Sequence, residues 1–459
     1  MDSAYRPRLS FWQVWNMGFG FLGVQLGWGL QTAEMSPIFK ALGPLGVALL
    51  WVAVPLTRLL IQPVIGALSD RTWGALGRRR PYFLVGAILG SLALLALPQC
   101  RALWMLAGLL WILDAAIQVA TVPLRALVAD QLPDEQRAAG FAMQSAFIGA
   151  GAVVAALLPW MLQHGFGVAS AAGEGFPPNV RLAFYIGGAV FLGAVLWTAV
   201  TSPEYPPENA AEFRREKAER RGLIAELGEA LRQMPAMMKH LALVQFFTWL
   251  GLFCMWLHFA NAVPQIFGAT DPGSPLFHAA TDWAWVCYVV KDAVTVLAAF
   301  ALMALARSQD LRLIHAVCLT CGAVGLLSVG FIRGEGQKAL LVLALGLGGF
   351  AWASILSMPY ALLAGALPAR RAGAYLGVFN CFIVLPEILA VLTFGPLVKN
   401  LLGGNLIHAV MAGGFFMLIA AVLTLFVPDT RLGATTLLPV VVEDEGMLPT
   451  LTPPEVPET

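Results

Sequence analysis

Residues 66–83 read GALSDRTWGALGRRRPYF and separate two long apolar stretches, residues 44–68 and 82–98. A short basic loop between segments of this kind is typical of a membrane protein, because loops on the cytoplasmic side are enriched in Lys and Arg. Gly66 allows a close approach of helices, and Asp70 can pair with the arginines that follow it or with the end of a neighbouring helix. The stretch therefore predicts a turn between two membrane-spanning helices.

The whole chain has the composition of a polytopic membrane protein. Of its 459 residues, 59% are hydrophobic and 12% are charged, and the mean hydropathy is +0.75. Soluble proteins carry about 25% charged residues. Apolar segments of about 20 residues span a bilayer as helices, because lipid offers no hydrogen-bond partners to an open backbone. We predict twelve such spans: 12–38, 44–68, 82–98, 102–129, 138–163, 181–200, 237–263, 280–306, 312–332, 338–364, 373–398 and 405–427.

The distribution of basic residues predicts the orientation. With the N-terminus inside, 19 of the 28 Lys and Arg residues fall on cytoplasmic segments, which agrees with the positive-inside rule. We therefore expect both termini to be cytoplasmic. The segment before residue 12 has no small-residue cleavage site, so we expect the first span to be retained rather than removed as a signal peptide. Three cations fall within predicted spans: Arg58, Arg125 and Lys291.

An internal repeat predicts two similar halves. VPLRALVADQLPDEQRAAGFAMQ begins late in the fourth predicted span, and MPYALLAGALPARRAGAYLGVFN late in the tenth, with the same order of Pro, small and apolar residues, Pro, Arg and small residues. Such repeats are typical of secondary transporters whose substrate site lies near the midplane of the membrane. We expect an N-terminal six-helix bundle over 1–200, a cytoplasmic linker with a short amphipathic helix over 201–236, a C-terminal six-helix bundle over 237–427 and a disordered cytoplasmic tail over 428–459.

Other classes of function find no support in the sequence. The chain contains no P-loop and no hydrolase or metalloprotease motif, so we expect neither an enzyme nor an ATP-driven pump. A net charge of +1 argues against nucleic acid as a partner. Cys318 and Cys321 form C-x-x-C, but no second pair completes a zinc site. We expect no metal and no cofactor, and a chain that functions as a monomer.

The loop 66–83 resembles the G-x-x-x-D-R-x-G-R-R-type signature of the major facilitator superfamily. The segments VQLGWGLQ (24–31), QPVIGALSDR (62–71), LDAAIQVATVPLRALVAD (113–130), SMPYAL (357–362) and GVFNCFIVLPE (377–387) are similar to plant sucrose transporters and their bacterial maltose- and sucrose-type relatives, which belong to the glycoside–pentoside–hexuronide:cation symporter group. The resemblance implies an all-α membrane protein with twelve helices in two pseudo-symmetric halves, placed in a bacterial inner membrane. It also implies the residues of a conformational gate: Gly66, Asp70, Arg71, Gly77, Arg78, Arg79 and Arg80.

The fourth predicted span carries two charges that matter for transport. Asp114 lies about twelve residues into the span, where an ionised group costs roughly 2.5–3.5 kcal/mol. Arg125 follows eleven residues later on the same stripe, about 16 Å along the helix, so the two side chains cannot bond directly. The resemblance implies proton-coupled import of an α-glucoside such as maltose or sucrose, with Asp114 as the proton and sugar site and Arg125 as its partner in coupling. The alternative is a buried ion pair that only joins helices.

Sugar hydroxyls bind amides and carboxylates, and aromatic faces cover the C–H surface of a sugar ring. The predicted spans that line the cavity in this superfamily supply several such side chains, although each could equally form an interhelical hydrogen bond or an interfacial anchor. The candidate substrate-binding residues are Gln25, Trp28, Gln31, Gln118, Trp352, Asn380 and Glu387.

Several charges depart from the family pattern. Arg58 stands where a Gly is usual, Glu387 replaces a Gln, and His258, Lys291 and Asp292 add further titratable groups within the spans. Counted with Glu34, Asp114 and Arg125, these residues comprise four acids and three permanent cations, a near balance that predicts pairing across helices. Adjacent residues on a helix point about 100° apart, so we expect Lys291 and Asp292 to have different partners. Alternatively, these charges adapt the site to a modified or acidic sugar or to another coupling ion.

Two further functions remain open at the level of sequence. One is a carrier of the same fold for a different polar solute. The other is a membrane sensor that has lost transport, against which the intact loop signature and the intact Asp114 and Arg125 argue.

Overall fold

The structure is a computed structural model, and it describes residues 7–33, 55–100, 102–170, 176–206, 211, 213, 215, 222–269, 271–367 and 371–428. Within these ranges the chain is helical apart from short turns. The helices are α1 (Phe11–Ala33), a helix over residues 55–70, α3 (Arg80–Ala96), α4 (Leu103–Gln131), α5 (Asp134–His164), α6 (Pro178–Thr201), α8 (Leu223–Arg232), α9 (Ala236–Phe267), α10 (Pro275–Leu305), α11 (Leu311–Ser328), α12 (Lys338–Ala366), α13 (Ala372–Asn400) and α14 (Leu406–Leu425).

Ten helices in the described part of the chain are long and apolar enough to cross a membrane: α3, α4, α5, α6 and α9 to α14. The protein is therefore a multi-pass membrane protein, and ten of the twelve predicted spans have a direct counterpart. The predicted span 12–38 coincides in part with α1, which is not among the ten because polar residues such as Asn16, Gln25 and Gln31 interrupt its apolar sequence. The predicted span 44–68 lies partly outside the described residues, and its described part is helical; the predicted tail lies outside them from residue 429 onward.

The helices extend beyond the predicted apolar spans where polar residues can end them. The fifth span is predicted from hydropathy to start at residue 138, but α5 begins at Asp134. Acidic residues in the first turn of a helix interact favourably with the helix dipole, so the helix extends beyond the apolar segment. The eighth span is predicted to start at residue 280, but α10 begins at Pro275. The side chain of the preceding Ser274 accepts a hydrogen bond from the backbone N–H of Phe277 at 3.2 Å and so caps the helix. Hydropathy locates the spans, and these caps locate their ends.

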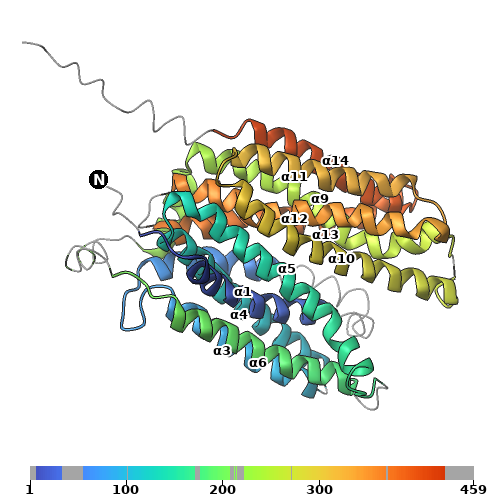
Figure 1. The fold of residues 1–459 in the computed structure, drawn as a ribbon, viewed down its shortest axis with the longest axis horizontal. Coiled ribbons are helices and arrows are strands. Elements are labelled where there is room, and N and C mark those ends of the chain that lie inside the picture. Colours follow the sequence, from blue (N-terminus) through green and yellow to red (C-terminus); the bar gives the residue numbers. More distant parts are fainter. Residues whose placement is uncertain are drawn as a thin grey trace, which may run out of the picture. The chain divides into compact units, whose positions relative to one another are not determined.

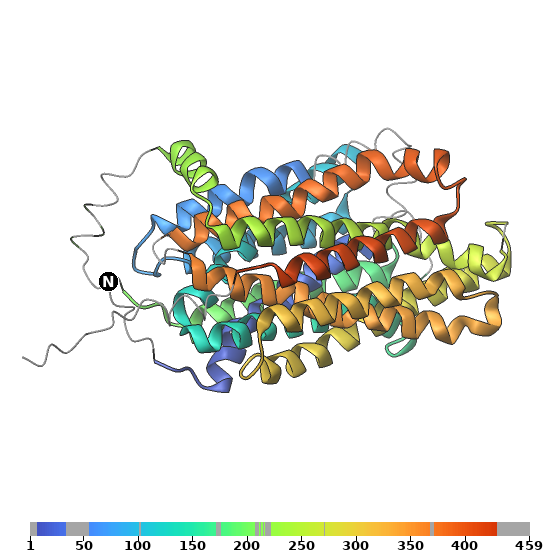
Figure 2. The ribbon, with the colours of Figure 1, turned by 90° about the horizontal axis from the view of Figure 1, so that it is seen from above.

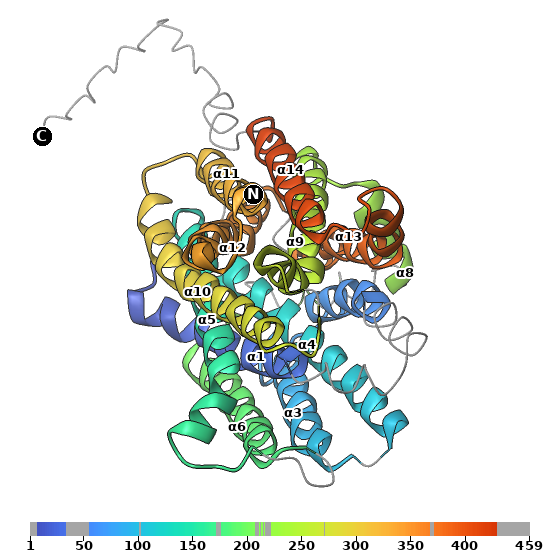
Figure 3. The same ribbon diagram turned by 90° about the vertical axis from the view of Figure 1, so that its right-hand side faces the viewer.

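The helices lie alongside one another in two groups (Figure 1). Viewed end on, α1 and α3 to α6 occupy one side, and α9 to α14 occupy the other (Figure 3). Within the first group α1 packs on α5 and α6, and α3 packs on α4 and α6; within the second α9 packs on α14, and α11 packs on α12 and α14. The groups meet where α5 contacts α10 and α12 and where α4 contacts α13.

Small residues allow the helices to approach closely, as is common in membrane bundles. A Cβ added to Gly251 on α9 would stand 2.7 Å from the carbonyl oxygen of Gly413 on α14, and the reverse substitution gives the same distance. The outer surface carries large apolar side chains such as Leu297, Leu343 and Val200, which face outward as expected for contact with lipid. Charged and amide side chains such as Asp114 and Gln144 are buried instead, so the polar chemistry lies inside.

Candidate functional site: an ion cluster inside the bundle and a polar network at its end

An ion cluster joins three helices inside the bundle. The guanidinium of Arg58, on the helix over 55–70, donates to Asp114 of α4 through Nη2 at 2.7 Å and Nε at 3.0 Å. The same group donates through Nη1 to both carboxylate oxygens of Glu387 on α13, at 3.4 Å each. The Asp114 side chain is fully buried, while Arg58 and Glu387 retain 16% and 7% of their exposure. The predicted pairing of these charges across helices is therefore observed.

The cluster explains how Asp114 is tolerated in an apolar helix. A buried carboxylate without a partner is strongly destabilising, whereas a close guanidinium supplies both opposite charge and directed hydrogen bonds. With both acids ionised, the cluster contains two negative charges and one positive charge. A site with this surplus is suited to bind one proton.

An amide pair lies one helical turn beyond the cluster. Gln62 donates to the side-chain oxygen of Gln118 at 2.6 Å. Arg58 and Gln62 are four residues apart, as are Asp114 and Gln118, so the two helices run parallel with their polar side chains in matching positions. Gln118, a predicted sugar ligand, thus lies next to the predicted proton site.

Arg125 does not contact Asp114, in agreement with their predicted separation along α4. Its guanidinium lies over the ring of Tyr360 on α12, 4.3 Å from the centroid, and Nη1 donates to the Tyr360 hydroxyl. That hydroxyl donates to the side-chain oxygen of Asn380 on α13 at 2.8 Å. Arg125 and Asn380, predicted separately, therefore meet through Tyr360. Sequence reasoning missed Tyr360, although it follows Pro359 in the repeated segment and so occupies the position that corresponds to Leu124 beside Arg125.

Lys291 and Asp292 contradict the expectation of separate partners. Lys291 Nζ donates to the carboxylate of Asp292, its neighbour on α10. The prediction considered the directions of the Cβ atoms, but the long, flexible side chain of lysine can turn back to an adjacent acid. The Lys291 ammonium also lies 5.7 Å from the ring centroid of Trp352, which packs edge-on against Trp249 and Trp256 of α9. The predicted Trp352 is thus part of an aromatic cluster.

The other predicted residues lie on α1 and α9 or fall outside the described residues. Gln25, Trp28 and Gln31 are on α1, and Gln31 is buried with its side-chain oxygen lacking a hydrogen-bond partner among the described residues. Within the same residues, no hydrogen bond connects these three to Asp114. His258 lies on α9 with its ring 6.2 Å from that of Phe394 on α13. Glu34 falls outside the described residues.

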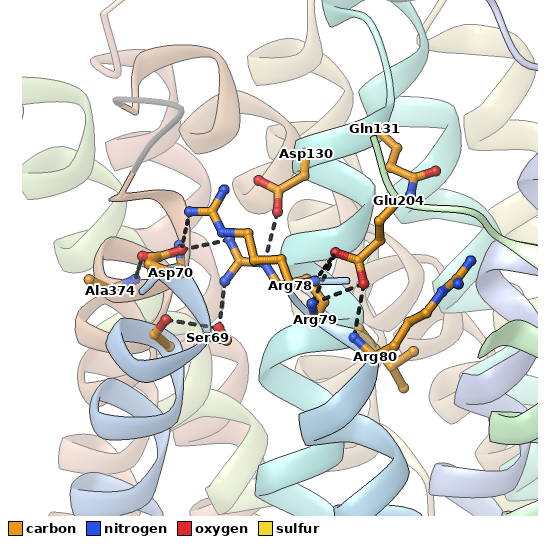
Figure 4. A network of polar contacts seen from close by, with 12 residues as sticks. Ser69, Asp70, Arg78, Arg79, Arg80, Asp130, Gln131, Glu204 and Ala374 are labelled. Carbon is orange, nitrogen blue, oxygen red and sulfur yellow. Dashed lines mark hydrogen bonds and ion pairs between the residues drawn. The ribbon is translucent and has the colours of Figure 1, made fainter. Parts of the chain in front are cut away.

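The predicted gate residues form a polar network at one end of the bundle, shown in Figure 4. We call this end, where residues 66–83 meet the start of α13, the loop end. The Asp70 carboxylate accepts from Arg78 at 3.0 Å and pairs with Arg79 at 2.6 Å. It also accepts from the backbone N–H groups of Gly373 at 3.1 Å and Ala374 at 2.7 Å. Asp70 therefore meets both expected partners, the basic run and a neighbouring helix end, where the helix dipole favours an anion.

Gly66 and Gly377 allow the helix over 55–70 to touch α13 through backbone atoms. A Cβ at Gly66 would lie 2.1 Å from the carbonyl oxygen of Gly373, and a Cβ at Gly377 would lie 2.6 Å from that of Gln62. Cβ atoms do not approach that closely, so only glycine fits. The close approach expected at Gly66 is observed.

Arg79 is fully buried and connects this network to α4. Its Nε donates to Asp130 at 2.8 Å, and Nη1 donates to the hydroxyl of Ser69. Burial alone would lower the pKa of the Arg79 guanidinium, but the carboxylates of Asp130 and Asp70 outweigh that effect and raise the pKa. Arg79 therefore stays charged, because its surroundings provide the negative charge that it needs.

Glu204, just after α6, was missed by sequence reasoning. Its carboxylate accepts from the backbone N–H groups of Arg78 at 2.8 Å and of Arg79 and Arg80 at 2.9 Å each (Figure 4). The N–H groups at the start of a helix have no partner within the helix, so Glu204 satisfies the beginning of α3. Gly77 has a φ of +92°, which turns the chain towards this carboxylate. The only signal in the sequence was an acid beside prolines in SPEYPPEN.

The short helix α8 lies at the same end, set at an angle to the long helices (Figure 2). Arg71 Nε donates to Glu226 of α8 at 2.7 Å, and Arg371, just before α13, pairs with Glu229 at 3.5 Å. The predicted amphipathic helix of the linker thus exists, and its acids contact segments from both sides of the linker.

Comparison with known proteins places this geometry in context. The family model described as the Major Facilitator Superfamily matches residues 17–391. The sucrose transport protein SUT3 of Oryza sativa subsp. japonica is 26% identical over 474 residues, covering 90% of this chain and 92% of that protein. A general alpha-glucoside permease of Schizosaccharomyces pombe is 28% identical over 262 residues, covering 50% of this chain and 44% of that protein. The crystal structure of a variant of the E. coli fucose:proton symporter FucP has the same fold, with a TM-score of 0.66 at 12% identity, and the match covers 92% of this chain and 98% of that one.

Proposed function

Because the chain belongs to the major facilitator superfamily, we propose that it is a proton-coupled symporter that imports an α-glucoside disaccharide, such as maltose or sucrose, by alternating access. It is a membrane sugar transporter by family and not an enzyme. The relatives named for sucrose and alpha-glucoside transport support the substrate class. The full arrangement that we propose has twelve spans in two six-helix halves, divided at the linker 201–236, with both termini cytoplasmic, in a monomer of a bacterial inner membrane.

A neutral sugar requires a coupling ion for accumulation, because the membrane potential does no work on it. One elementary charge that crosses 100 mV carries about 2.3 kcal/mol, which corresponds to roughly fifty-fold accumulation. The observation on which the proposal depends is the fully buried Asp114 carboxylate, held by Arg58 at 2.7 Å inside the bundle. A titratable acid at this position can bind a proton from one side of the membrane and release it to the other.

The sugar site that we propose lies between the ion cluster and the aromatic cluster. Gln118 and Glu387 flank Asp114, and Asn380 is held by Tyr360. Trp352 provides an aromatic face. Helix α1 contributes Gln25, Trp28 and Gln31, and the Gln31 side-chain oxygen has no hydrogen-bond partner among the described residues. Amide groups and aromatic faces of this kind suit the hydroxyls and the C–H surface of a sugar.

The gate that we propose is the Asp70 network with Gly66, Arg71, Gly77, Arg78, Arg79 and Arg80. In this structure it holds the helix over 55–70 against α13 at the loop end. Alternating access requires these contacts to separate when the site opens towards that end.

The principal alternative is a carrier for another polar or acidic sugar-like solute. Three cations within the predicted spans could attract an acid, but Arg58 is paired with two carboxylates and Lys291 with one. The remaining cation, Arg125, lies against Tyr360. This pairing favours a neutral substrate.

Right-side-out membrane vesicles test the function directly. Maltose, sucrose and a uronide are added in turn while the external pH is recorded. We expect a neutral disaccharide to cause external alkalinisation that an uncoupler and Asp114→Asn both abolish. A response to the uronide alone would favour the acidic-solute carrier, and accumulation of none of the three would remove the sugar assignment.

A further inference from the structure

We infer that Glu387 is the group that holds the coupling proton, and that its protonation releases α13 from the helix over 55–70. This inference rests on the proposed function, which requires a proton at the ion cluster, and it moves the site of that proton from Asp114 to Glu387. It assigns a proton-binding role to a residue that the sequence predicts only as a sugar contact, and leaves Asp114 as the permanent anion that anchors Arg58.

The charge of the cluster requires one proton and no more. Two carboxylates and one guanidinium leave one uncompensated negative charge in an apolar bundle, where an unpaired charge is strongly unfavourable. Within the described ranges, the charged or titratable groups on the neighbouring helices have other surroundings. Arg125 of α4 lies on Tyr360, and Glu226 and Glu229 of α8 pair with arginines at the loop end. The ring of His258 on α9 lies 6.2 Å from that of Phe394, and its Nε2 has no hydrogen-bond partner in the described part of the chain. One bound proton therefore neutralises the cluster.

The distances indicate which acid takes the proton. Charge-assisted hydrogen bonds between nitrogen and a carboxylate are normally about 2.7–2.9 Å. Arg58 reaches Asp114 at 2.7 Å but Glu387 only at 3.4 Å, so less attraction is lost when Glu387 becomes neutral. The Asp114 side chain has no exposed surface, whereas 7% of the Glu387 side chain and 16% of the Arg58 side chain remain exposed, so Glu387 is the acid nearer to solvent.

The position of Glu387 connects the proton to the movement of helices. Between the helix over 55–70 and α13 runs an antiparallel seam, in which Gly66 meets Gly373, Gln62 meets Gly377, and the Leu59 carbonyl accepts from the Cys381 thiol at 3.9 Å. Arg58 and Glu387 form the ionic contact of this seam furthest from the loop end. The two helices come from opposite sides of the linker, so the seam must part for the site to open at the loop end.

The proton step changes no bond of the sugar. A hydronium ion that reaches the cluster gives its proton to a carboxylate oxygen of Glu387, and the neutral carboxyl no longer attracts the Arg58 guanidinium. Arg58 remains with Asp114, the cluster becomes neutral, and the seam loses its ionic contact. After opening at the loop end, Glu387 returns the proton to water on that side.

The experiment follows the separation of the two sides of the seam as a function of pH. Spin labels are placed at Leu76→Cys, in the loop 66–83, and Ser308→Cys, after α10, in full-length protein without its native cysteines. Both positions are exposed and lie outside the cluster. Double electron–electron resonance then reports the distance across the loop end. Because no substrate is needed, the result does not depend on the sugar assignment.

We expect opposite effects on this distance from two variants that each remove one carboxylate charge, Glu387→Gln and Asp114→Asn. In the parent the distance lengthens as the pH falls. Glu387→Gln mimics the protonated acid and should give the long distance at every pH. Asp114→Asn leaves Arg58 and Glu387 as a balanced pair and should give the short distance at every pH. The control Glu335→Gln, which removes an exposed carboxylate before α12, should follow the parent.

The outcomes separate this inference from the proposed function. A Glu387→Gln protein that follows the pH response of the parent, or two variants that shift in the same direction, would overturn the inference. In proteoliposomes, the control Glu335→Gln should accumulate sugar against its gradient, but Glu387→Gln should not. If it accumulates sugar as the parent does, the inference fails while symport stands. If the parent moves no sugar but the distances respond as expected, the substrate assignment fails while the inference stands.

Discussion

Gly66 and Gly373 touch through their backbones: a Cβ added at Gly66 would stand 2.1 Å from the carbonyl oxygen of Gly373. This contact brings the helix over 55–70 close enough to α13 for Asp70 to reach the first N–H groups of that helix. The loop signature thus depends on a glycine as much as on its charges.

Gly66→Ala should therefore destabilise the closed loop end. Inserting a methyl group into a tightly packed contact costs about 1–3 kcal/mol, and about 1.4 kcal/mol changes a conformational equilibrium tenfold. We expect the labelled distance across the loop end to lengthen and the rate of uptake to fall. Gly74→Ala is the matched control in the same loop, because nothing lies within 4 Å of its added Cβ. Equal uptake by the two variants would contradict the importance of this contact.

Glu204→Ala should weaken the loop from the other side. It removes the acceptor for three backbone N–H groups at the start of α3. Loss of a helix cap costs about 0.5–2 kcal/mol. We expect a lower midpoint of thermal unfolding in detergent and slower uptake, with Glu204→Asp recovering part of both. Glu335→Ala, which removes an exposed acid elsewhere, should change neither; a Glu204→Ala protein indistinguishable from it would refute the capping role.

Tyr360→Phe tests the connection between Arg125 and Asn380. The variant keeps the ring under the guanidinium but removes the hydroxyl that bonds both partners. A hydrogen bond to a charged group contributes about 1.5–3 kcal/mol, so we expect a clear loss of uptake, with a larger loss for Tyr360→Ala. Tyr375→Phe removes a hydroxyl from α13 and serves as the comparison. Uptake by Tyr360→Phe at the level of Tyr375→Phe would show that the hydroxyl is dispensable.

Sequence reasoning located the helices and the loop network because both depend on local pattern. Apolar length predicts spans, and Asp70 lies in the same loop as two of its partners, Arg78 and Arg79. The contacts that it missed join residues far apart in the chain. Glu204 reaches Arg78 from 126 residues away, and Arg125 reaches Tyr360 across 235. Charge balance predicted pairing across helices, but it could not identify Arg58 as the partner of both Asp114 and Glu387. The sequence of a single helix does not determine how that helix is aligned against its neighbours.

Lys291 and Asp292 allow a test of whether a buried charge pair serves structure or transport. Removing one member of a buried pair leaves an uncompensated charge and costs about 3–5 kcal/mol, whereas replacing both is often nearly neutral. We expect Lys291→Met and Asp292→Asn each to lower the midpoint of thermal unfolding, and the double variant to recover most of the loss. If the pair is purely structural, uptake should recover together with stability. A double variant that is stable but does not accumulate sugar would instead assign Lys291, which lies 5.7 Å from the Trp352 ring centroid, to the transport site.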